Sequence, residues 1–142
     1  MKITIKNFQK KIPVNPNRIK KTILNVLSQE EAGKISGELT ICFVNDLKIK
    51  ELNLKYRHKN SPTDVLAFGM LKQGNSGRKF FDIIISTDTA IRNAHLFKTR
   101  PLYELNLYVV HGILHLLGYA DRTPKQRQLM RQKEREYVHT QN

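Results

Sequence analysis

The chain has 142 residues, with 25 Lys and Arg against 12 Asp and Glu, so its formal net charge is +13. This length suits a single domain, and no stretch approaches the ~20 apolar residues of a membrane-spanning helix. One cysteine, Cys42, excludes an intrachain disulfide and favours the reducing cytoplasm, while the positive charge favours a nucleic-acid partner.

Strand and helix patterns alternate along the chain. Alternating and apolar runs predict four strands, at residues 2–6, 38–44, 64–70 and 80–86. Apolar residues at helical spacing predict five helices, which begin near residues 16, 45, 87, 101 and 123 and end, for the first four, near residues 33, 56, 96 and 117. The turn signal Gly74-Asn75-Ser76-Gly77 predicts a hairpin between the last two strands. We therefore expect an α+β fold: one domain over residues 1–142, with about four strands in a mixed sheet packed against about five helices.

The helix predicted from Pro101 to Leu117 is apolar on nearly every side. Proline suits its first turn because proline has no N–H group to leave unpaired there. A helix without a polar face is typical of a central, buried position. We therefore expect this helix to lie at the centre of the fold.

His111 and His115 lie four residues apart on that helix, and Asp121 follows six residues after the second histidine. Four-residue spacing puts both rings on one helical face, with Cβ atoms about 6 Å apart. A glycine, Gly118, ends the helix and lets the chain turn back with Asp121. Three protein ligands leave one tetrahedral position open for water, which is the catalytic arrangement of zinc.

The alternative for this pair is that each histidine is a core residue with locally satisfied nitrogens. Burying two polar rings costs free energy unless both find partners, and a metal ion satisfies both at once. We predict one bound metal ion per chain, with Zn²⁺ as first choice and another divalent transition metal as the alternative. The pattern also resembles the His-Glu-x-x-His signature of zinc proteases, but Gly112 stands where those enzymes carry their general base, which disfavours protease chemistry.

The wider motif His111-Gly112-x-Leu114-His115-Leu116-x-Gly118-Tyr119-x-Asp121 resembles the signature of the YbeY family of bacterial endoribonucleases. Other parts of the chain resemble further blocks of that family: residues 52–57, 61–68 and 81–86, with Met130 and Glu134 in the last helix. Most members carry histidine as the third ligand, where this chain has Asp121. The chain also has Ala67 in place of a usual serine and Phe81 in place of a usual glycine.

The resemblance implies metal-dependent cleavage of single-stranded RNA by an enzyme acting in rRNA maturation, at the 3′ end of 16S rRNA, and in ribosome quality control. It implies rRNA and the small ribosomal subunit as partners, and no membrane. It assigns catalysis to His111, His115 and Arg57, because Arg57 matches an active-site arginine whose forked guanidinium fits phosphate oxygens. Without the resemblance, Arg57 is a solvated residue at a helix end. Asp82 is expected to orient a ligand histidine, with a structural role as the alternative.

Two other functions remain open on the sequence. One is a non-enzymatic ribosome assembly factor that binds rRNA and holds a structural metal. The other is a zinc hydrolase of another substrate class, such as a peptide, which Gly112 disfavours. The basic residues are spread over several segments, including Arg122, Lys125, Arg127 and Arg131, and an RNA groove would gather some of them on one face. The attacking group, whether water or the RNA 2′-hydroxyl, and the oligomeric state stay open.

Overall fold

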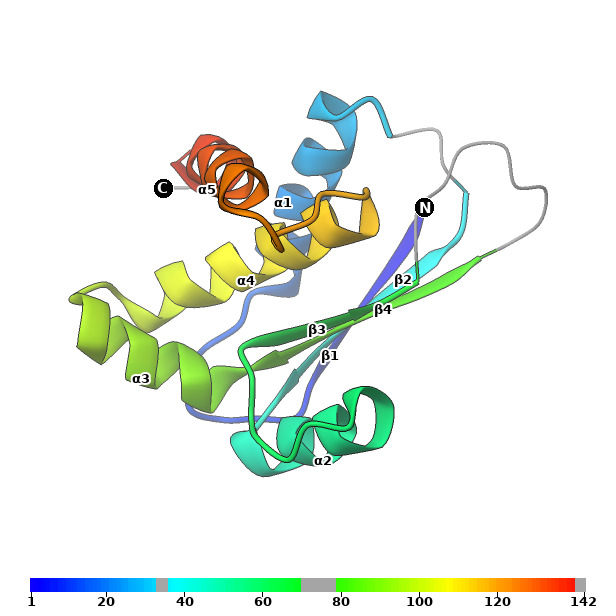
Figure 1. Cartoon of the computed structure of the whole chain (residues 1–142). Coiled ribbons are helices and arrows are strands. Elements are labelled where there is room, and N and C mark those ends of the chain that lie inside the picture. Colours follow the sequence, from blue (N-terminus) through cyan, green and yellow to red (C-terminus); the bar gives the residue numbers. More distant parts are fainter. Residues whose placement is uncertain (33–35, 70–78, 140–142) are drawn as a thin grey trace.

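A computed structural model describes residues 1–32, 36–69 and 79–139, and it shows one sheet with helices on both faces (Figure 1). The elements of the described residues follow the order β1 (Lys2–Asn7), α1 (Pro16–Gln29), β2 (Glu38–Val44), α2 (Asp46–Arg57), β3 (Val65–Phe68), β4 (Phe80–Ser86), α3 (Thr87–Phe97), α4 (Pro101–Leu116) and α5 (Pro124–His139). This arrangement confirms the predicted α+β class. The predicted end of the first helix at Gly33 and the turn at residues 74–77 lie outside the described residues.

The sheet is mixed, with the strand order β1-β2-β4-β3. β1 pairs with β2 and β2 with β4 in parallel, whereas β3 pairs with β4 antiparallel, with Ala67 opposite Ile83. The antiparallel neighbours β3 and β4 agree with the predicted hairpin. β3 is therefore an edge strand, and its outer side faces away from the sheet.

Side chains alternate between two hydrophobic clusters, one on each face of the sheet. Ile83 and Ile85 of β4 belong to the large core formed with α1, α4 and α5. Ile84 packs against a smaller cluster that includes Ile49 of α2 and Leu66 of β3. Figure 1 shows α2 on one side of the sheet and α4, with α1 and α5, on the other.

Helix α4 is central, as predicted, and its residues Leu105, Val109 and Ile113 have no exposed surface. The helix lies close against the sheet at Gly112, where a Cβ atom would lie 2.9 Å from Cγ2 of Ile83. A larger residue at position 112 would push α4 away from β4. The glycine that replaces the protease glutamate thus has a packing reason.

None of the helices in the described part of the chain is both long enough and apolar enough to cross a membrane.

Candidate metal centre

Three side chains with metal-binding atoms meet beside α4. Nε2 of His111 lies 2.9 Å from Nε2 of His115. Oδ2 of Asp121 lies 3.7 Å from the first of these nitrogens and 3.4 Å from the second. The structure thus brings together all three residues that the sequence predicted as ligands, with their ligand atoms within 4.8 Å of one another.

Asp121 reaches the histidines because α4 ends in a tight reversal. The N–H groups of Gly118 and Tyr119 donate to the carbonyl oxygens of His115 and Leu114, each at 3.0 Å. Gly118 has a φ of +102°, and its Cβ position has open space around it, so conformation rather than crowding requires glycine there. This helix end returns the chain toward the face that carries the histidines.

The loop after α4 is held on one side by Glu30, at the end of α1. The Glu30 carboxylate accepts hydrogen bonds from the hydroxyls of Tyr119 and Tyr137 and, at 3.0 Å, from Nζ of Lys133. Burial raises the pKa of Glu30, but these hydrogen bonds and the charge of Lys133 outweigh burial and lower it overall. Glu30 is therefore a carboxylate at neutral pH that ties the loop to α1 and α5.

The loop is also held from α5. Nη1 of Arg127 donates to the carbonyl oxygen of Arg122 at 2.9 Å and to that of Asp121 at 3.4 Å. A guanidinium that binds two consecutive carbonyls restrains the backbone directly at Asp121. Asp121 is thus positioned by contacts from two helices.

Glu134 of α5 orients the first histidine. Its Oε1 lies 2.8 Å from Nδ1 of His111, and its side chain is only 13% exposed. A carboxylate only accepts hydrogen bonds, so Nδ1 carries the proton and Nε2 points its lone pair into the cluster. Such an outer partner fixes the tautomer and the ring orientation of a metal-binding histidine.

The two histidines have opposite pKa shifts. Burial lowers the pKa of His111, but the hydrogen bond and charge of Glu134, helped by Asp64 and Asp121, raise it overall. The pKa of His115 is lowered, first by burial and then by the charge on His111. Without a metal ion, His111 therefore becomes positively charged before His115 as the pH falls.

These donor atoms fit one small divalent ion. Zinc ligands at about 2.0–2.2 Å in a tetrahedron lie roughly 3.3–3.5 Å from one another. The two distances from Asp121, 3.4 and 3.7 Å, are close to that spacing, and the 2.9 Å between the imidazole nitrogens needs a small outward rotation of the rings. Two neutral imidazoles and one carboxylate are also a common donor set for zinc.

Arg57 lies at the end of α2, across edge strand β3 from α4. Its Nη2 donates to the carbonyl oxygen of Ala67 at 3.0 Å, and its guanidinium lies 5.6 Å from the centre of the Phe68 ring. β3 itself packs against α4. Asp64, directly before β3, is near enough to His111 for its charge to help raise the pKa of that histidine. β3 therefore connects Arg57 to the neighbourhood of the histidines.

Asp82 is not brought to the metal cluster. It is exposed on β4 between Phe81 and Ile83, which are buried in the core on the α4 side. Successive side chains of a strand point to opposite faces, so Asp82 lies on the face away from the histidines. The partner of His111 is instead Glu134, which lies 23 residues further along the chain, and only its match to a family block drew attention to it.

Comparisons with known proteins agree with this geometry. The family model described as Endoribonuclease YbeY matches residues 4–142. Proteins described as Endoribonuclease YbeY from Syntrophus aciditrophicus and Desulforamulus reducens are 33% and 34% identical, over 96% and 94% of this chain and 87% and 93% of their own. A relative from Anaeromyxobacter dehalogenans is 41% identical over 73% of this chain, and the match spans about half, 54%, of its length. A solution structure of a Thermotoga maritima protein covers 98% of this chain and 88% of its own, with a TM-score of 0.68 and 28% identity.

Proposed function

This chain belongs to the YbeY family of endoribonucleases, and on that premise we propose that it cleaves single-stranded RNA with one divalent metal ion held by His111, His115 and Asp121. The observation that carries the proposal is the meeting of three ligand atoms within 4.8 Å, one of them from a loop that two helices restrain. Three protein ligands are typical of catalytic zinc sites, whereas structural sites have four.

The surrounding side chains prepare the site for a phosphodiester. A divalent ion at such a site supplies Lewis acidity to a phosphoryl oxygen and lowers the pKa of a bound water. Glu134 holds His111 in the tautomer that leaves Nε2 free, at a contact of 2.8 Å. Asp121 places a negative charge beside the two imidazoles. With a metal ion bound, this site would therefore carry one positive charge less than a site formed by three neutral histidines.

Arg57 is the proposed phosphate contact. Guanidinium has five N–H donors, and the structure uses one of its nitrogens for the carbonyl of Ala67. In the part of the chain that the structure describes, the remaining donors have no partner and can form a forked contact with two phosphate oxygens. The hydrogen bond to β3 keeps the guanidinium at the strand that packs against α4, so the positive charge is held rather than mobile.

The net charge of +13 supports a polyanionic substrate. We propose rRNA within the small ribosomal subunit as that substrate, with maturation of the 16S rRNA 3′ end and ribosome quality control in the cytoplasm as the setting. Zn²⁺ is the first choice of metal because two imidazoles and a carboxylate suit it, while Ni²⁺, Co²⁺ and Mn²⁺ are the alternatives to test.

The experiment compares cleavage of a single-stranded and a double-stranded oligoribonucleotide by the wild type, His111→Ala, Arg57→Ala and the control His95→Ala. His95 is an exposed histidine of α3, away from the cluster. We expect the wild type and the control to cut the single strand, the other two variants to lose most of this cleavage, and a chelator to abolish it until metal is added. Equal cleavage by His111→Ala and the wild type would overturn the proposal, and RNA binding without any cleavage would favour an assembly factor.

A further inference from the structure

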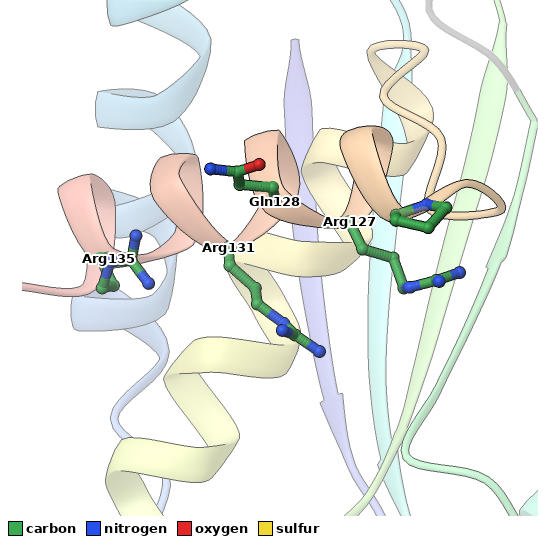
Figure 2. Close-up of a pocket in the computed structure, with 5 residues that line it drawn as sticks. Arg127, Gln128, Arg131 and Arg135 are labelled. Atoms are coloured by element: carbon green, nitrogen blue, oxygen red, sulfur yellow. The ribbon is translucent and has the colours of Figure 1, made fainter.

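Three arginines recur every four residues along α5, at Arg127, Arg131 and Arg135. Together with Pro124 and Gln128, they line a hollow of about 360 Å³ (Figure 2). Residues four apart share one face of a helix and are separated by about 6 Å along its axis. The three side chains therefore start at regular intervals from one face of α5 and form a row of cations, here called the arginine ladder.

No acidic side chain in residues 1–32, 36–69 and 79–139 pairs with the arginine ladder. In the described residues, the side chains of Arg131 and Arg135 take part in no hydrogen bond or ion pair, and the guanidinium of Arg127 donates only to the carbonyls of residues 121 and 122. Guanidinium stays protonated at any physiological pH. Like charges four residues apart on a helix repel each other, and an anion lying on the ladder would relieve that repulsion.

The arginine ladder begins at the metal centre. Arg127 contacts the backbone of Asp121, and Glu134, next to Arg135 in sequence, contacts His111. The same helix thus orients one metal-binding histidine, holds the loop of the third ligand and carries the row of cations. A polyanion lying along the ladder would have one part at the cluster.

We propose that the arginine ladder binds successive phosphates of the single-stranded RNA whose cleaved bond lies at the metal centre, an inference that rests on the proposed function. The forked guanidinium matches phosphate geometry, and arginines at regular intervals along a helix suit a repeating phosphate backbone. None of the five residues that line the hollow is aromatic, so the ladder contacts phosphates rather than stacking on bases. No large apolar side chain lines the hollow. Protein–protein interfaces usually have a water-excluding centre with large anchor side chains, so the hollow suits RNA better than a protein partner.

The test compares Arg131→Gln/Arg135→Gln with a control that removes two positive charges elsewhere, Arg18→Gln/Lys21→Gln on the exposed side of α1. Arg127 is left intact because it restrains the loop at Asp121. The full chain is titrated with a fluorescent single-stranded oligoribonucleotide over a series of salt concentrations, with a chelator present to stop cleavage. Each lost phosphate contact makes the negative slope of log affinity against log salt shallower by about 0.7, so we expect the slope of the ladder variant to be shallower by about 1.4 and its binding to be weaker.

An unchanged salt slope in the ladder variant would overturn the proposal, because Arg131 and Arg135 would then not contact RNA phosphates. An equally large change in the control would also overturn it, because the effect would then come from the net charge of the protein. Cleavage measured with metal present separates this outcome from failure of the proposed function. If the ladder variant cleaves a long strand with raised KM and unchanged kcat, it has lost binding and not chemistry. If the wild type cleaves no RNA, the proposed function fails, while the salt slope still decides whether the arginine ladder binds phosphates.

Discussion

Replacing Glu134 tests how strongly α5 supports the metal centre. Glu134→Ala removes the acceptor that lies 2.8 Å from Nδ1 of His111, in a contact where the two side chains are only 13% and 22% exposed. Glu134→Gln keeps an acceptor but removes the charge. Losing such an outer partner weakens metal binding by about 10–100-fold. Because this contact is little screened by solvent, we place the alanine variant near 100-fold, or about 2.7 kcal/mol, and the glutamine variant near tenfold, or about 1.4 kcal/mol.

The assay is a competition for Zn²⁺ between each variant and a chelator of known affinity. Glu136→Gln, an exposed neighbour on the same helix, is the matched control and should bind Zn²⁺ like the wild type. Thermal unfolding of the metal-free proteins checks that the variants fold. Wild-type affinity in Glu134→Ala, with the fold intact, would show that the ring of His111 needs no partner on α5 and would refute the reasoning.

Three further predictions concern stability. Gly112→Ala places a Cβ atom 2.9 Å from Ile83. It should lower the free energy of unfolding by about 1 kcal/mol, because an overpacking cost of about 1–3 kcal/mol exceeds the gain in helix propensity. Urea unfolding measures this difference, and a variant more stable than the wild type would show that α4 has room at the sheet. Burial raises the pKa of Asp46, but hydrogen bonds from an arginine and two hydroxyls lower it overall. The ionised carboxylate therefore stabilises the fold fully above the pKa of an unfolded aspartate, about 4. This stabilisation is lost as the pH falls through the lower pKa of Asp46 in the folded protein. Asp46→Asn should therefore be less stable than the wild type at pH 7, by about 1–3 kcal/mol, and the difference should close in acid; a gap that persists in acid would contradict the assignment. Glu30→Ala should lower the free energy of unfolding by about 1–3 kcal/mol, since it removes the acceptor shared by Tyr119, Lys133 and Tyr137, and should weaken metal binding more than Tyr119→Phe does. Equal metal affinity in Glu30→Ala and the wild type would show that the loop holds Asp121 unaided.

Local pattern was enough to predict most of the fold. Apolar residues on nearly every side of α4 indicated a buried helix. The spacing of His111, His115 and Asp121 around Gly118 predicted a cluster, and the structure brings these residues together. These features depend on residues close in sequence, where helical geometry and the glycine turn decide the outcome.

The parts that sequence did not reveal depend on which elements pack together. On β4, Asp82 lies among apolar residues of both faces, because α2 covers one face of the sheet and α4 the other. Alternation alone therefore does not say which face meets the histidines. Glu134 is separated from His111 by a helix end and a loop, so no spacing rule relates the two. The position of Arg57 against edge strand β3 likewise follows from the pairing of β3 with β4.

The central claim is that Asp121 completes a metal centre that cleaves RNA, and one paired measurement tests it directly. Bound metal per chain and single-strand cleavage are measured on the same preparations of the wild type, Asp121→Asn and Asp121→His. We predict one metal ion per chain and cleavage in the wild type and in the histidine variant, which restores the ligand usual in the family. We predict loss of both in Asp121→Asn, whose neutral amide is a poor zinc ligand. Full metal content and full cleavage in Asp121→Asn would contradict the account.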